Sequence, residues 1–105
     1  MNQPLTPREA IPELEKLWDV DGFFGRLRQG DYDTDGVGVL EQLLRAIQID
    51  DNIALPRRFV SLTWWIPMFM EWQAERVAQR GGDVEQLKRD VVRIRNVLDN
   101  LLGVP

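Results

Sequence analysis

The chain has 105 residues, of which 44% are hydrophobic, and it contains neither cysteine nor histidine. Without cysteine, a disulfide framework, a thiolate zinc site and a thiol nucleophile are excluded. Without histidine, the chain lacks the commonest general base and the commonest transition-metal ligand. The length and apolar content suit one core, so we expect residues 1–105 to form a single domain that is not an enzyme and holds no cofactor.

The net charge of -4 is unevenly distributed along the chain. Up to Asn52 there are eleven acidic and five basic residues, a balance of -6, whereas six acidic and eight basic residues follow, a balance of +2. Such a field disfavours nucleic acid and anionic membranes and favours a basic protein partner, although solubility alone would explain the same excess. The basic residues of the second half alternate with acidic ones at ion-pair spacing, for example Glu85 and Arg89, which is typical of a solvated face.

The N-terminal segment MNQPLTPREAIPEL has neither the basic region nor the apolar region of a secretion signal. The longest apolar run, Phe59–Met70, has 12 residues and is interrupted by Ser61, Thr63 and Pro67. A bilayer span needs roughly 20 apolar residues, so we expect a cytoplasmic protein and a core segment here.

Helical signals begin at Thr6-Pro7-Arg8-Glu9, which matches a capping box with proline at the first helical position. A helix is predicted from about Pro7 to Trp18, and Pro12 would allow its first turn to be separate. We expect Asp21 to cap a short second helix over residues 23–27, which Gly30 ends in a left-handed conformation.

A third helix is predicted over residues 35–49, where apolar residues recur at three- and four-residue spacing. The segment Arg57–Arg80 is also helical in pattern but apolar nearly all round, which predicts a central helix with a kink or break at Pro67. Three tryptophans lie in this segment, and core packing explains them better than a ligand pocket does: Trp64, Trp65 and Trp72.

The last helix follows Asp83, its expected cap, with Gln86 at the capping-box position. Its apolar stripe consists of Val84, Leu87, Val91, Ile94, Leu98 and Leu101. One face of an intramolecular bundle is the favoured interpretation, and a homodimer through residues 83–102 is the alternative. The predicted fold is all-α, a compact bundle of four to five helices with the central apolar helix kinked at Pro67.

Residues 31–36 match the start of an EF-hand calcium loop, with Asp31, Asp33, Asp35 and Gly36 at the required positions. The bidentate glutamate of that motif falls on Gln42, which has only a neutral amide. We therefore predict no metal site. In this interpretation Asp31 and Asp33 form Asx turns, and either Asp35 or Thr34 caps the third helix; a calcium-binding loop is the minor alternative.

The acidic side chains at both ends of the short second helix are the candidate partner-binding surface. A tyrosine among carboxylates is typical of a hot spot for a basic partner, and a solvated loop is the plain alternative. The candidate residues are Asp19, Asp21, Asp31, Tyr32, Asp33 and Asp35.

A small acidic helical chain without cysteine or histidine, carrying a tyrosine-bearing acidic loop, resembles in type the immunity proteins of bacterial toxin–immunity pairs. The resemblance implies a stoichiometric inhibitor that neutralises a basic toxin by occlusion, and no site residue is carried over from it. The alternative function is a self-associating structural or adaptor module.

Overall fold

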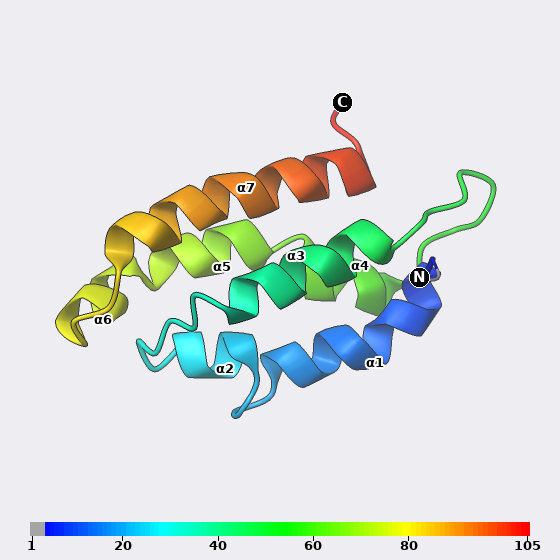
Figure 1. Cartoon of the computed structure of the whole chain (residues 1–105). Coiled ribbons are helices and arrows are strands. Elements are labelled where there is room, and N and C mark those ends of the chain that lie inside the picture. The colour runs from blue at the N-terminus through cyan, green and yellow to red at the C-terminus, as the bar shows by residue number, and fades with distance from the viewer. Residues whose placement is uncertain (1–3) are drawn as a thin grey trace.

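The fold is built from seven α-helices, described for residues 4–105 in a computed structural model (Figure 1). In chain order they are α1 (Pro7–Trp18), α2 (Phe23–Leu27), α3 (Gly36–Ala46), α4 (Arg57–Thr63), α5 (Ile66–Trp72), α6 (Ala74–Gln79) and α7 (Val84–Leu102). Within residues 4–105 there is no strand, and the extended pairing is limited to an isolated bridge between Leu5 and Ile47. The predicted all-α fold is therefore confirmed.

Helix α1 starts as its local sequence predicts. The hydroxyl of Thr6 accepts a hydrogen bond from the Glu9 N–H, and the Glu9 carboxylate accepts one from the Thr6 N–H. These bonds form a capping box and lower the pKa of Glu9, chiefly through the backbone N–H of Thr6. The separate first turn considered at Pro12 does not occur, because α1 is continuous through that residue.

Helix α2 folds back tightly against the end of α1, and glycine permits the close approach. A Cβ on Gly25 would lie 1.9 Å from the carbonyl oxygen of Asp19. The expected cap by Asp21 was wrong: the N-cap is Gly22 and makes no side-chain hydrogen bond. Gly30, with φ of +86°, ends the turn that follows α2 in the predicted left-handed conformation.

Helix α3 has Asp35 as its N-cap residue, but the Asp35 side chain makes no capping hydrogen bond. One carboxylate oxygen of Asp33 accepts hydrogen bonds from the N–H groups of Asp35 (3.1 Å) and Gly36 (3.0 Å). Asp33 therefore satisfies the first turn of the helix in place of Asp35 or Thr34, through the Asx turn expected of it.

The C-terminal end of α3 is set by a distant segment. The helix ends at Ala46 and not at Ile49, because Ala46 C=O accepts a hydrogen bond from Leu5 N–H and Gln48 N–H donates one to Leu5 C=O, both 2.8 Å. These two bonds form the isolated bridge and tie the segment before α1 to the end of α3.

The segment predicted as one helix over residues 57–80 is divided into α4, α5 and α6. Trp64 and Trp65 form the turn between α4 and α5, and Pro67 lies in the first turn of α5, where its missing N–H is not required. The interruption thus precedes the proline, and the kink at Pro67 itself stays a prediction. Taken as one divided element, α4 to α6 complete a bundle of five helices.

The core lies between two groups of helices. Helix α1 packs against α2 and α4, whereas α7 packs against α3, α5 and α6. The regular stripe of α7 is buried in this core through Leu87, Val91, Ile94 and Leu98. The favoured interpretation of α7 as one face of an intramolecular bundle is therefore confirmed.

Candidate interaction surfaces

The six candidate partner-binding residues lie on the two connections that flank α2. Asp19 and Asp21 are exposed on the α1–α2 turn, and Asp35 is exposed just before α3. Within residues 4–105, none of these three carboxylates forms an ion pair with lysine or arginine. Their charge is therefore available to an approaching partner.

The other two aspartates of the group share a cation within the chain. Arg26 Nε lies 2.9 Å from a carboxylate oxygen of Asp31, and another nitrogen of the same guanidinium lies 3.6 Å from Asp33. The hydrogen bond to Asp31 is the main reason that the pKa of Arg26 is raised. Two of the three carboxylates required for a calcium loop are thus committed to Arg26, and within residues 4–105 no three acidic side chains come together as metal ligands would.

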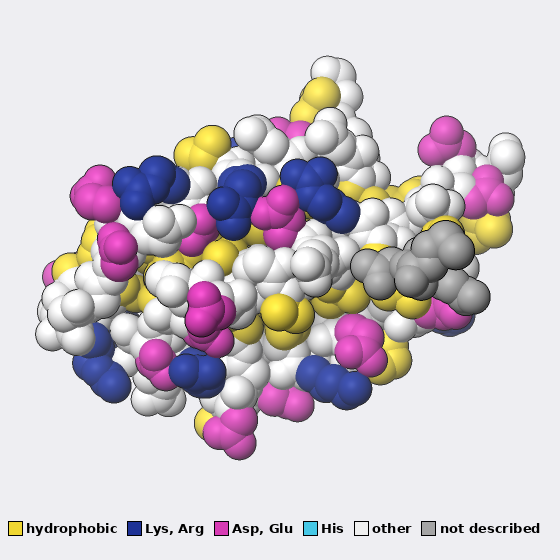
Figure 2. Space-filling model, in the orientation of Figure 1, with side chains coloured by type: hydrophobic (Ala, Val, Ile, Leu, Met, Phe, Trp, Pro, Cys, Tyr) yellow, Lys and Arg dark blue, Asp and Glu magenta, His cyan; other side chains and the backbone are white. Residues whose placement is uncertain are grey.

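Basic side chains from α6 also reach this region. Arg76 donates a hydrogen bond to the carbonyl of Arg28 (2.8 Å), and Arg80 donates one to that of Gln29 (3.1 Å). Both bonds satisfy carbonyl groups at the C-terminal end of α2, where positive charge is favourable. Figure 2 shows acidic and basic side chains interspersed over the face formed by α2, α3 and α7.

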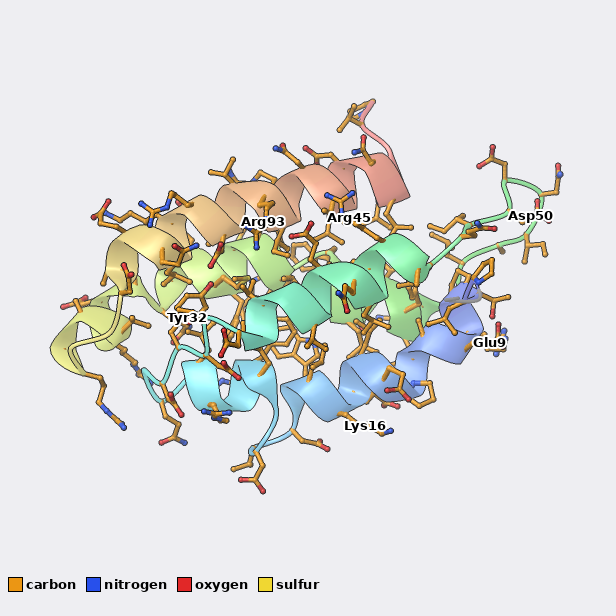
Figure 3. The ribbon with its side chains drawn as sticks, in the orientation of Figure 1. Glu9, Lys16, Tyr32, Arg45, Asp50 and Arg93 are labelled. Carbon is orange, nitrogen blue, oxygen red and sulfur yellow. The ribbon has the colours of Figure 1, made fainter. Side chains whose placement is uncertain are left out.

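Tyr32 points into the molecule, toward α7, and not toward solvent (Figure 3). Its hydroxyl donates a hydrogen bond of 2.5 Å to Asp90 of α7, and its ring lies edge-on to Phe23 with centroids 6.1 Å apart. Burial, and then the bond to Asp90, raise the pKa of the Tyr32 hydroxyl above its ordinary value. The ring is only half-buried, but its polar end is already bound within the chain.

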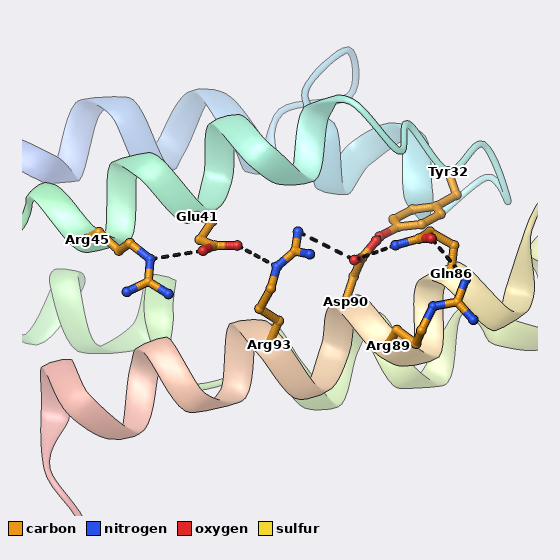
Figure 4. Close-up of polar contacts among 7 residues, drawn as sticks. All are labelled: Tyr32, Glu41, Arg45, Gln86, Arg89, Asp90 and Arg93. Atoms are coloured by element: carbon orange, nitrogen blue, oxygen red, sulfur yellow. Dashed lines mark hydrogen bonds and ion pairs between the residues drawn. The ribbon is translucent and has the colours of Figure 1, made fainter.

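Asp90 is fully buried and is the centre of a polar network between α7 and the segment before α3 (Figure 4). Besides Tyr32, its carboxylate accepts a hydrogen bond of 2.8 Å from the Gln86 side chain and lies 3.5 Å from the Arg93 guanidinium. A buried carboxylate is tolerated only when it is paired in this way. Gln86 therefore does not complete the capping box expected of it; Asp83 alone caps α7.

The network continues through Arg93 to α3. Arg93 Nε donates to Glu41 at 2.6 Å, and Arg45 Nε donates to the other carboxylate oxygen at 2.9 Å (Figure 4). The hydrogen bonds from Arg45 and then Arg93 lower the pKa of Glu41. Six side chains thereby join α3, α7 and the loop that carries Tyr32: Tyr32, Gln86, Asp90, Arg93, Glu41 and Arg45.

Sequence reasoning missed this network, although one signal was present. Asp90 is one of the acidic residues of the second half that were together assigned to a solvated face, yet it stands at a three–four spacing between the apolar residues Leu87 and Ile94 of α7. An acidic residue in register with a buried stripe is an expected place for a paired internal charge. The example ion pair Glu85–Arg89 was also wrong, because Glu85 lies near Lys88 and Arg89 donates to Gln86.

The tryptophans separate into an inner pair and an outer pair. Trp18 stacks on Phe24 at 4.3 Å and on Trp65 at 6.1 Å, and its indole N–H donates to the carbonyl of Leu62. Trp65 in turn meets the edge of Trp72 at 5.7 Å. Trp18 and Trp65 are half-buried against the core, as expected for Trp65.

Three large apolar side chains of α5 and of the turn before it are exposed: Trp64 by 57%, Met68 by 42% and Trp72 by 62%. We call them the tryptophan face. The assignment of Trp64 and Trp72 to the core was therefore wrong. Between this face and α7 lies a groove of about 300 Å³, lined by Trp64, Pro67, Met68, Arg95, Leu98, Asp99, Leu102 and Gly103.

No family model, curated protein or solved structure matches this chain. The candidate surfaces therefore rest on the geometry of the described residues. Within residues 4–105, no helix combines the length and the apolar character needed to cross a bilayer.

A second hollow, of about 830 Å³, lies between α7 and the loop that joins α3 to α4. Asp50 lies on this projecting loop (Figure 3), and its carboxylate accepts the N–H of Asn52. The hollow is wide and mixed in polarity, and among its lining residues in the described part of the chain there is no converging set of buried polar groups of the kind that orients a small ligand.

Proposed function

We propose that this chain is a protein-binding domain that acts by covering a surface of its partner in a stoichiometric complex. The observation that carries the proposal is the tryptophan face, where Trp64, Met68 and Trp72 are exposed on successive turns. Adjoining large apolar side chains are seldom left in water without a purpose, and tryptophan is enriched among residues that dominate binding at protein interfaces.

The proposed partner is a basic protein. The net charge of -4 supports this choice, as do the exposed carboxylates of Asp19, Asp21 and Asp35. Such charges accelerate the encounter with a partner of opposite sign more than they strengthen the final complex. A bacterial toxin neutralised by occlusion is the leading case, in keeping with the resemblance in type to immunity proteins.

The six candidate partner-binding residues are proposed to contribute unequally to the attraction of a basic partner. Asp31 and Asp33 share Arg26, which reduces their effect on an approaching cation. Tyr32 is proposed to be a positioning residue instead of an anchor, because its hydroxyl is bound to Asp90. Asp19, Asp21 and Asp35 then carry most of the steering field.

A non-catalytic role in the cytoplasm is part of the same proposal. The chain has no histidine or cysteine, and the buried carboxylate of Asp90 is engaged by Tyr32, Gln86 and Arg93. Because this carboxylate is fully buried and engaged by three neighbours, we assign it a structural role.

Self-association is the second candidate function. The apolar stripe of α7 is used by the core, so a homodimer through residues 83–102 would have to use the polar outer side of that helix. That side carries the exposed Val92 among charged neighbours, which offers much less apolar area than the tryptophan face.

The proposal is tested by capturing the partner from the native host on the tagged chain, identifying it by mass spectrometry and measuring its affinity in purified form. Trp64→Gln with Trp72→Gln removes the two indoles and keeps good helix formers at both positions. Val39→Gln, at an equally exposed valine of α3, is the matched control. We expect the double variant to bind at least about tenfold more weakly and the control to bind normally. If the double variant binds the partner with full affinity, the tryptophan face is not the interface.

The charge of the partner is tested separately by association kinetics. Asp19→Asn, Asp21→Asn and Asp35→Asn together should lower the association rate and flatten its dependence on salt. Asp31→Asn with Asp33→Asn should do so less, because Arg26 already offsets those charges. Unchanged rates in both variants, with the fold intact, would show that the partner is not recognised through its positive charge.

A further inference from the structure

We infer that the partner presents an amphipathic helix to the tryptophan face, with lysine or arginine beside its apolar stripe; this rests on the proposed function and names the chemistry of the occupant. The inference follows from the shape of the face, from the groove beside it and from the charges at its edge.

The tryptophan face has the shape of a helix ridge. Trp64, Met68 and Trp72 recur every four residues, and Trp64 and Trp65 keep right-handed helical dihedral angles across the α4–α5 turn. The ridge therefore continues for two turns, about 12 Å. Ridges formed by residues four apart pack into the grooves of another helix.

The groove beside the ridge can receive the apolar stripe of such a helix. Trp64 and Met68 form one wall, and Leu98 and Leu102 of α7 contribute to the other. A partner helix lying along α5 would place one apolar side chain in this groove. The side chains one turn before and after it on the partner helix would cover the exposed indoles. This is the helix-in-groove mode of recognition, with anchors at i, i+4 and i+7.

The edge of the face is negatively charged. Glu71 lies 3.5 Å from Arg95, and this pair offsets one carboxylate. Asp99, in the groove, and Glu75, near the start of α6 and four residues after Glu71, are exposed and form no ion pair within residues 4–105. A helix with lysine or arginine next to its apolar stripe would complement them.

The same charges argue against other occupants. A second copy of this chain would bring its own Glu75 and Asp99 to the interface, where like charges repel. An anionic membrane would be repelled in the same way, because the whole chain has a charge of -4. A basic amphipathic helix is the occupant that would cover the apolar ridge and also complement the carboxylates at its edge.

Two synthetic helical peptides test the inference directly. Both carry leucine at i, i+4 and i+7; one has lysine on either side of this stripe, and the other has glutamate at the same positions. Binding is followed by tryptophan emission and by calorimetry. We expect the lysine peptide to bind at least about tenfold more tightly than the glutamate peptide.

Variants then assign the peptide to the face. Trp64→Gln with Trp72→Gln should weaken binding of the lysine peptide by about tenfold or more, and Val39→Gln should leave it unchanged. Glu75→Lys with Asp99→Lys changes only exposed positions and should reverse the preference between the two peptides. Circular dichroism confirms that each variant is folded before it is used.

Several results would overturn the inference. These are failure of the lysine peptide to bind, equal affinity for the two peptides, or binding that persists in the Trp64→Gln, Trp72→Gln variant. Light scattering that shows a dimer abolished by this variant would assign the face to a second copy. Binding to phosphatidylserine vesicles that the variant abolishes would assign it to a membrane. The proposed function fails separately, when the captured partner binds the double variant at full affinity.

Discussion

The buried bond between Tyr32 and Asp90 gives the sharpest test of how this fold is held together. Tyr32→Phe removes one hydroxyl and keeps the ring that lies against Phe23. The Asp90 carboxylate is fully buried, so water cannot replace the lost donor in the folded chain. The substitution therefore isolates a single hydrogen bond to a buried charge.

The magnitude follows from the partners of the carboxylate. Loss of one hydrogen bond to a charged group costs about 1.5–3 kcal/mol, and Gln86 and Arg93 remain to hold Asp90. Asp90→Ala leaves the Tyr32 hydroxyl and the Gln86 amide without their acceptor, which should cost about 3–5 kcal/mol. The variant that combines Tyr32→Phe with Asp90→Ala should lose about 2 kcal/mol less free energy of unfolding than the sum of the two single variants, because both remove the same hydrogen bond.

The assay is equilibrium unfolding in urea at 25 °C, followed by circular dichroism, with the free energy of unfolding obtained by linear extrapolation. Tyr32→Leu, which also removes the ring, separates loss of the hydroxyl from loss of packing. A cost below about 0.5 kcal/mol for Tyr32→Phe, or a coupling energy near zero, would refute the reasoning. Either result would mean that another donor replaces the Tyr32 hydroxyl at the Asp90 carboxylate.

Three other expectations follow from the same contacts. The pKa of Glu41 is lowered in the folded chain, so its ionised carboxylate stabilises the fold. Wild type should therefore be more stable than Glu41→Gln at neutral pH, and this difference should disappear as the pH falls below 4.5, the ordinary pKa of glutamate. Urea unfolding between pH 7 and 3 measures the difference. Gly25→Ala should cost about 2 kcal/mol or more in thermal unfolding, because its Cβ would meet the Asp19 carbonyl; a neutral effect would mean that α2 shifts freely. Ile66→Ala, in the core, should cost about 2–5 kcal/mol, and a loss below about 0.5 would contradict its burial.

The sequence determined the features that depend on neighbours within one turn. The capping box of Thr6 and Glu9, the left-handed Gly30 and the cap at Asp83 were all predicted and are all present. Each depends on hydrogen bonds or backbone angles within a few residues, so a local pattern is sufficient. The buried stripe of α7 was also predicted, because its apolar residues keep to one side of a helix.

Only the tertiary structure decided where the polar groups near α2 would find partners. Tyr32 was predicted to belong to a partner-binding surface, and only the structure shows that its hydroxyl bonds to Asp90, 58 residues away in the chain. The end of α3 likewise depends on Leu5, which belongs to a segment before α1. No local pattern encodes such contacts, because they form only when distant helices pack.

The outward position of Trp64 and Trp72 was decided in the same way. A segment that is apolar all round has no polar side to mark the surface, so its sequence predicts burial without saying which side is covered. Helix α5 packs against α7, and the ring of Phe69 lies against Trp18 and Phe24. Ile66, Phe69 and Met70 are thereby buried, whereas Trp64, Met68 and Trp72 stay exposed. The apolar content of α5 was fixed by the sequence, but the number of helices available to cover it determined which residues form the tryptophan face.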